Sequence, residues 1–257
     1  MKLTVLNDNI ASRTCGAEFG LSYYIEEKIK ILFDTGPTDI FLKNAKILNK
    51  NLHETDYIVL SHGHWDHGNG LQYLFGQKLI CHPQTFVRRF KKDGTYVGLI
   101  ITEEAASKQF NLISTNEPYQ ISDKIYYLGE IPRHNDFEFQ DQVYFKNDGS
   151  FDYVQDDSAL AIDTKQGLII VSGCSHSGIC NIIEHAKNII DSRKVHAVIG
   201  GFHLQNVDER LERTIEYFKN EKIDLVLPSH CTSYEVKFEF YKHFNMQQVT
   251  SGSIFQF

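Results

Sequence analysis

The stretch LSHGHWDHGNG, residues 60–70, places three histidines and one aspartate within six positions. Its first residues end the run DYIVLSH at 56–62, an apolar run that is typical of a buried strand. His62 and His64 are two residues apart, so their rings can converge on one ion, while Asp66 and His67 can face a second ion. Imidazole and carboxylate together suit Zn²⁺, Fe or Mn²⁺. The stretch therefore predicts a metal site at a strand end rather than a solvated polar loop.

Composition bounds the class of protein. The chain has 257 residues, 42% of them hydrophobic, and no low-complexity linker, so we expect a single domain over residues 1–257. Five scattered cysteines without a CxxC pair fit a reducing compartment. A net charge of −7 and the absence of a long basic run make nucleic acid an unlikely partner.

No apolar run is long enough to span a membrane, and the first residues lack the apolar core of a signal peptide. We therefore expect a cytoplasmic protein without a membrane partner. The sequence leaves the oligomeric state open.

Strand-like and helix-like patterns alternate along the chain. Strands are expected at 2–6, 21–27, 28–36, 56–62, 158–164, 167–173, 196–203 and 223–230, with a short β-like end at 246–257. Helices are expected at 38–50, 178–191, 208–222 and 234–244. Residues 85–120 carry no clear pattern, and residues 130–157 have the composition of a long polar loop or hairpin with several aromatic residues.

Four of the expected strands end in polar residues that include histidine. The endings are VLSHGH, VSGCSH, IGGFH and LPSH, which contribute His176, His203 and His230 besides the first motif. Strand ends that gather on one edge of a layered fold form a common site. The sequence therefore predicts that these histidines act together.

The motifs resemble a known family. SHGHWDHGNG resembles the signature of the metallo-β-lactamase superfamily, and LFDTG, SGCSHSG, IGGFHL and PSHCTS follow the order and rough spacing of its other motifs. The resemblance covers nearly the whole chain. Its combination of motifs is most similar to the branch labelled dihydropterin-ribofuranosylaminobenzene-phosphate synthase-like.

The resemblance implies an α+β (αβ/βα) fold, a four-layer sandwich of two mixed β-sheets flanked by helices, with the site at one edge of the sheets. It implies two divalent metal ions, with Zn²⁺ first and Fe or Mn as alternatives. His62 and His64 would hold the first ion, completed or bridged by His176. Asp66, His67 and His230 would hold the second ion. Asp34 would hold the ligand residues in place without binding an ion itself.

The chain departs from the superfamily pattern at two places. Cys174 stands where an aspartate usually bridges both metals, so either its thiolate bridges, His176 takes that duty, or Cys174 is a small buried residue. The usual third histidine is also missing. Asp156 or Asp157 can replace it as a ligand, with His134 a poorer candidate and ordinary loop carboxylates the competing interpretation.

Two further residues follow strands near the expected site. His203 comes after two glycines that allow close approach to a substrate, and we expect it to face the substrate or transfer a proton. A buried, hydrogen-bonded histidine is the alternative. Cys231, next to His230, is expected to be a packed small residue.

These residues predict a metal-dependent hydrolase that activates water against a phosphoester, ester or lactone in a small molecule. Asp66 and His203 would be its catalytic residues. One alternative is a transferase that joins a dihydropterin diphosphate to an arylamine ribofuranosyl phosphate, in which loop aromatics stack on a flat heterocycle or instead form a small core of their own. These are Phe137, Phe139, Tyr144, Phe145, Phe151 and Tyr153. The other alternative is a non-catalytic metal or redox sensor.

Overall fold

The chain divides into two compact units, each with its own sheet. The computed structural model describes residues 1–138, 143–191 and 194–257. The first unit comprises Met1–Asn116, Gln142–Asp156 and Val249–Phe257, and the second comprises Glu117–Asp141 and Asp157–Gln248. The expectation that the whole chain is a single domain stays a prediction.

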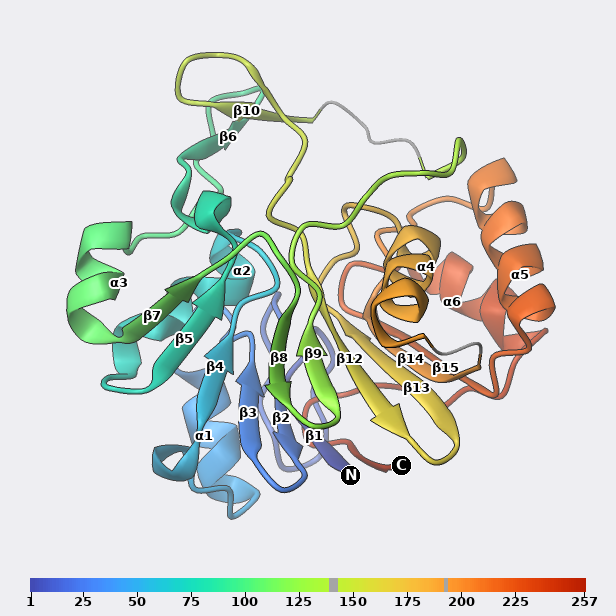
Figure 1. Cartoon of the computed structure of the whole chain (residues 1–257), viewed down its shortest axis with the longest axis horizontal. Helices are drawn as coiled ribbons and strands as arrows, with labels where there is room; N and C mark the ends of the chain where they lie inside the picture. Colours follow the sequence, from blue (N-terminus) through green and yellow to red (C-terminus); the bar gives the residue numbers. More distant parts are fainter. Residues whose placement is uncertain (139–142, 192–193) are drawn as a thin grey trace. The chain divides into compact units, whose positions relative to one another are not determined.

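The first unit contains a seven-stranded sheet in the order β16-β1-β2-β3-β4-β5-β7. It is antiparallel from β16 to β3 and parallel from β3 to β7 (Figure 1). Its strands are β1 (Lys2–Asn7), β2 (Ser22–Glu26), β3 (Lys30–Phe33), β4 (Tyr57–Val59), β5 (Lys78–Cys81), β7 (Asn111–Ser114) and β16 (Ile254–Gln256). A small antiparallel sheet is formed by β6 (Arg89–Lys91), β10 (Tyr144–Lys146) and β11 (Phe151–Asp152).

Helices make the crossovers that parallel strands require. In the first unit they are α1 (Ile40–Ile47), α2 (Trp65–Gly68) and α3 (Glu103–Gln109), with 3₁₀ turns at Leu52–Glu54, Asn69–Tyr73 and Pro83–Phe86. Phe41 and Ala45 of α1 join the buried core that includes Leu32 of β3 and Ile58 of β4. Burial of this apolar cluster fixes the end of β4, where the histidine motif begins.

The second unit contains a six-stranded sheet in the order β15-β14-β13-β12-β9-β8. Its strands are β8 (Tyr119–Ser122), β9 (Ile125–Tyr127), β12 (Ala159–Thr164), β13 (Gly167–Ser172), β14 (Val195–Gly201) and β15 (Leu225–Ser229). Strands β13, β14 and β15 are parallel, so their carboxyl ends share one edge. This edge carries the later histidine motifs.

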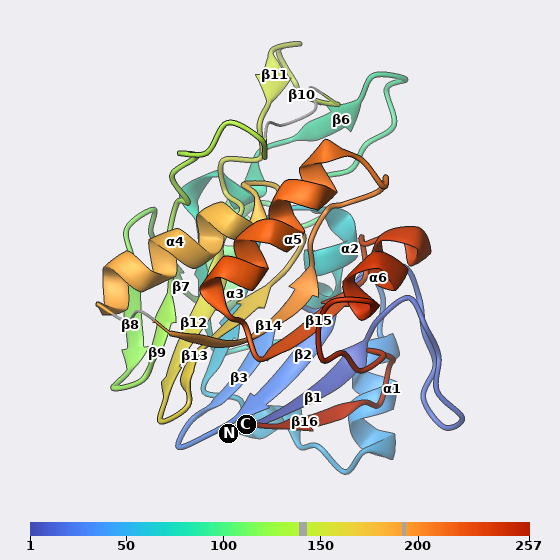
Figure 2. The same cartoon turned by 90° about the vertical axis from the view of Figure 1, so that its right-hand side faces the viewer.

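Three helices complete the second unit: α4 (Ile179–Ile190), α5 (Glu209–Glu221) and α6 (Tyr234–Tyr241). Figure 2 shows α4 and α5 lying over one face of its sheet. The isoleucines of α4 that the sequence places on one face, Ile179, Ile182 and Ile183, are buried in the core of this unit. The same core holds Phe218 of α5 and Phe240 of α6.

All the expected helices and strands are present with small shifts at their ends, except that the β-like end expected at 246–257 is a strand only at Ile254–Gln256. The region that the sequence left unassigned forms β6, α3, β7 and the start of β8, and the polar segment before Asp157 contains the β10–β11 hairpin. Among the described residues, no helix has both the length and the apolar character needed to cross a membrane.

We predict that Phe240→Ala lowers the free energy of unfolding by about 3–5 kcal/mol, because it leaves a cavity in a packed aromatic cluster. The Phe240 ring lies 5.6 Å from both Phe202 and Phe218, measured between ring centroids. The matched control is Phe238→Ala on the same helix, where the side chain is 60% exposed and the loss should be below about 1 kcal/mol. Denaturant unfolding measures both, and equal losses would contradict the assignment of Phe240 to this core.

Candidate metal centre

The histidine motif begins one residue after β4 and runs into α2. His62 and His64 are buried, and His62 Nε2 lies 2.8 Å from His64 Nδ1. The other nitrogen of His62, Nδ1, lies 2.9 Å from Ser61 Oγ. His62 Nε2 and His64 Nδ1 thus lie at hydrogen-bond distance, and neighbouring neutral imidazoles are donors that Zn²⁺ and related ions commonly bind. These two residues therefore fit a metal.

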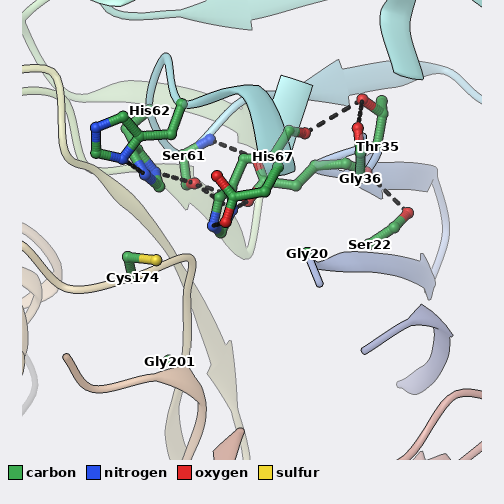
Figure 3. Close-up of polar contacts among 12 residues, drawn as sticks. Gly20, Ser22, Thr35, Gly36, Ser61, His62, His67, Cys174 and Gly201 are labelled. Carbon is green, nitrogen blue, oxygen red and sulfur yellow. Dashed lines mark hydrogen bonds and ion pairs between the residues drawn. The ribbon is translucent and has the colours of Figure 1, made fainter. Parts of the chain in front are cut away.

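His67 is oriented by Asp34. Its Nδ1 lies 2.7 Å from Asp34 Oδ2, and Asp34 also accepts hydrogen bonds of 2.7 Å from the backbone N–H and from Oγ of Ser61. Figure 3 shows Ser61, His62 and His67 gathered at this point. A histidine that donates from Nδ1 to a carboxylate presents Nε2 to a metal. Asp66 Oδ2 lies 3.7 Å from His67 Nε2, which places a carboxylate beside that nitrogen.

The turn between His62 and His64 depends on a buried ion pair. Gly63 donates its backbone N–H to Asp156 Oδ2 at 2.7 Å, and a Cβ at Gly63 would lie 1.8 Å from the carbonyl oxygen of Thr85. Arg89, which is fully buried, holds the same carboxylate through Nη1 at 3.1 Å and Nη2 at 2.9 Å. Its Nε lies 2.9 Å from Asp152 Oδ2. Asp156 is thus committed to Arg89 and Gly63.

This result separates the two aspartates that the sequence left as alternatives. The oxygens of Asp156 bind Arg89 and Gly63, whereas Asp157 Oδ2 accepts a hydrogen bond of 2.8 Å from the N–H of Ser177. Asp157 Oδ1 is buried and has no hydrogen-bond partner among the described residues. Burial raises the pKa of Asp157 to about 6, although the N–H of Ser177 and the charge of Arg133 oppose this.

The remaining sequence candidates lie after the parallel strands of the second unit. Cys174 and His176 follow β13, His203 follows β14 and His230 follows β15. Cys174, His176 and His230 are buried, and the rings of His176 and His203 lie 4.4 Å apart. Ligands at the carboxyl ends of neighbouring parallel strands are a recurrent arrangement in α/β sheets.

The backbone at these strand ends is unusual. Asp34 after β3, Ser175 after β13, His203 after β14 and His230 after β15 have φ between 44° and 58°. This left-handed region is uncommon for residues other than glycine and concentrates at functional sites. Sequence analysis missed this feature, as it missed Arg89, because neither has a local pattern in the chain.

The aromatic residues of the 137–153 segment form small clusters. Phe151 lies 5.1 Å from Phe145 and 6.4 Å from Tyr153, between ring centroids. Tyr144 lies 4.6 Å from the ring of His64. Phe137 packs under the guanidinium of Arg213, and Phe139 lies outside the described residues.

Comparisons with known proteins establish the class. Residues 15–80 match the model of the metallo-β-lactamase superfamily. The crystal structure of Tm1679, described as a metal-dependent hydrolase of the β-lactamase superfamily, matches with a TM-score of 0.90 and 26% identity, over 100% of this chain and 99% of that one. Zn²⁺-bound PqqB from Methylobacterium extorquens has the same fold, with a TM-score of 0.57 and 12% identity over the full length of both chains. The predicted α+β, metallo-β-lactamase-like fold is confirmed, and the chain belongs to this superfamily.

Sequence relatives narrow the family. The chain is 32% identical over 266 residues to the 7,8-dihydropterin-6-methyl-4-(β-D-ribofuranosyl)-aminobenzene-5′-phosphate synthase of Methanocaldococcus jannaschii, covering 94% of this chain and 90% of the relative. It is 36% identical to an uncharacterized protein of the same organism, over 91% of each chain. The chain therefore lies in the branch of the superfamily that contains this synthase, as its motifs predicted.

We predict that Arg89→Met lowers the free energy of unfolding by about 3–5 kcal/mol, because it leaves the carboxylates of Asp152 and Asp156 buried without their cation. The neighbouring Arg88 is exposed and lies over the rings of Phe90 and Tyr96, so Arg88→Met should cost about 1 kcal/mol or less. Denaturant unfolding compares the two variants. A loss in Arg89→Met no larger than in Arg88→Met would contradict the buried network.

We also predict that Asp34→Ala weakens metal binding by about 10- to 100-fold, because His67 loses the carboxylate that orients its ring. Competition with a chromophoric chelator measures the affinity, and circular dichroism checks the fold. The control is Asp56→Ala, an exposed residue just before β4. Unchanged affinity in a folded Asp34→Ala protein would show that Asp34 does not support the metal ligands.

Proposed function

We propose that the protein is a metal-dependent hydrolase that acts on a small molecule. The observation that carries this proposal is the close approach of His62 Nε2 and His64 Nδ1, beside a His67 whose ring Asp34 orients through its Nδ1–H. The superfamily membership and the similarity to a structure described as a metal-dependent hydrolase support it.

The ligand set that we propose follows the motifs of the superfamily. By resemblance to those motifs the proposed ligands are His62, His64, Asp66, His67, His176, His230 and Asp157, and Zn²⁺, Fe or Mn²⁺ would suit these donors. The unpartnered Oδ1 of Asp157 supports its place in the set. Cys174, the remaining candidate, lies within 4.8 Å of a ligand atom of His176 and of His230, and also of His203 and Cys231.

A divalent ion held by these residues would lower the pKa of a coordinated water and polarise the bond that the water attacks. The chain supplies the proton transfers and the orientation. Asp66, a buried carboxylate beside His67, would orient the attacking water and receive its proton. His203 is the residue that we expect to stabilise developing negative charge or protonate a leaving group.

Two substrate chemistries are compatible with this site, a phosphoester and a carboxylic ester or lactone. The net charge of −7 disfavours a nucleic acid substrate. We therefore propose a small-molecule substrate, and a screen of phosphodiesters, esters and lactones with the metal found in the protein would identify the class.

The second candidate function is a transferase that joins a dihydropterin diphosphate to an arylamine ribofuranosyl phosphate. The 32% identical relative named as a synthase favours it. In that reaction the metals would hold the diphosphate, and Tyr144 beside His64 is placed to contact a flat ring.

Release of diphosphate only when both substrates are mixed would establish the transferase, and hydrolysis of either substrate alone would establish the hydrolase. Metal or oxygen responses without turnover of any substrate would indicate a sensor.

We predict that His64→Ala abolishes metal-dependent turnover, because one of two converging ring nitrogens is lost, while circular dichroism shows a retained fold. Elemental mass spectrometry should show less metal per chain than in the unaltered protein. His53→Ala is the control, since His53 is exposed and lies before β4. Full activity in His64→Ala would refute the proposed site.

A further inference from the structure

Two thiols and an imidazole meet at the carboxyl ends of β13, β14 and β15. Cys174, His203 and Cys231 follow these three strands in turn, and one ligand atom of each lies within 4.8 Å of the other two. The Cys231 thiol donates to the carbonyl oxygen of Cys174 at 3.5 Å. All three residues belong to the second unit, so the cluster is complete within one compact part of the chain.

Gly201 makes this approach possible. Strand β14 lies between β13 and β15, so a side chain after β15 must cross β14 to reach one after β13. A Cβ at Gly201, the last residue of β14, would lie 2.5 Å from Cys231 Sγ and 3.4 Å from Cys174 Cα. Because Gly201 has no side chain, the sulfur of Cys231 lies over the middle strand.

His203 provides the third donor at an energetic cost to the backbone. Its φ of 50° is in the left-handed region, which costs of the order of 1–3 kcal/mol for a residue other than glycine. The imidazole forms a hydrogen bond with the Cys231 thiol. Its Nδ1 is buried and has no hydrogen-bond partner among the residues that the structure describes.

We propose that Cys174, His203 and Cys231 bind a thiophilic divalent ion, Zn²⁺ in the first instance, with Cys174 also close to His176 and His230. Two thiolates and one imidazole are preferred ligands of Zn²⁺, and Zn–S and Zn–N bonds of about 2.3 Å and 2.0–2.1 Å fit donor atoms separated by less than 5 Å. Binding forms two Zn–S bonds and one Zn–N bond and releases the two thiol protons to solvent. Three protein ligands leave a fourth position for water or a substrate atom.

This site goes beyond the proposed hydrolase centre and gives two residues new roles. Cys174 becomes a thiolate ligand beside Cys231 instead of a bridge between two histidine-bound ions. His203 becomes a ligand instead of a proton donor. Cys231, which the sequence favoured as a packed residue, becomes part of a functional site.

Cobalt spectroscopy on the full chain tests the proposal. Metal-free protein with reduced cysteines is titrated with Co²⁺, whose bonds to thiolate produce a near-ultraviolet charge-transfer absorption that nitrogen and oxygen ligands do not give. We expect this absorption in the unaltered protein, a fall by about half or more in Cys174→Ser and in Cys231→Ser because each removes one of two Co–S bonds, and weaker Co²⁺ binding in His203→Ala. Cys15→Ser, which changes a buried cysteine of the first unit, should retain it.

His64→Ala separates this proposal from the hydrolase proposal, because it removes turnover and should keep the charge-transfer absorption. A fall in the absorption in Cys174→Ser but not in Cys231→Ser would mean that Cys174 ligates without Cys231, and would overturn the site. Absence of the absorption in the unaltered protein would do the same.

X-ray absorption of the zinc-loaded, unaltered protein provides a test that needs no variant. The mean number of sulfur neighbours per zinc ion is multiplied by the number of zinc ions per chain from elemental analysis. A product of about two or more zinc–sulfur bonds per chain supports the site, and a product of about one or less overturns it, whether or not the serine variants fold.

Discussion

The carboxylate of Asp34 joins three consecutive pieces of the first unit. It lies directly after β3, accepts the backbone N–H and the hydroxyl of Ser61 after β4, and accepts Nδ1–H of His67 in α2. Thr35 continues the link, since its backbone N–H donates to the carbonyl oxygen of His67 at 2.7 Å. A buried carboxylate is costly unless its lone pairs are satisfied, and here backbone, hydroxyl and imidazole donors do so. The orientation of the histidine motif depends on this one group.

A second buried charge fixes the same loop from its other side. Arg89 and Asp156 form a paired, fully buried network, and Asp156 uses its remaining capacity on the N–H of Gly63. The geometry of a buried pair is strict because a misplaced charge in the interior has no water to solvate it. Gly63, between His62 and His64, is therefore held by a network that contains no histidine. Arg89 and Asp156 lie far from Gly63 in the sequence and hold its loop through an ion pair and a hydrogen bond.

The sequence was sufficient for the elements and for the first motif. Apolar runs located β12 and β13, which are buried on both faces, and helical periodicity located α4 and α5, which each bury one apolar face. The dense spacing of His62, His64, Asp66 and His67 predicted a metal motif, and the structure places these side chains directly after one strand, β4. Arg89 could not be found in this way, since its partners are distant in sequence and its own segment has no periodicity. The choice between Asp156 and Asp157 also needed the structure, because adjacent aspartates differ only in what surrounds them.

Strand ends explain why one scaffold can support both the hydrolase and the synthase interpretation. Asp34, Ser175, His203 and His230 all adopt left-handed backbone within three residues of a strand end, and this turns the chain where each strand ends. Such strain persists only where the surrounding structure imposes it, and here the sheets do so. The donors are thus fixed by the fold, whereas the substrate is selected by the loops that surround them. The chemistry of this chain is therefore decided by what the loops admit and by which metals the donors retain.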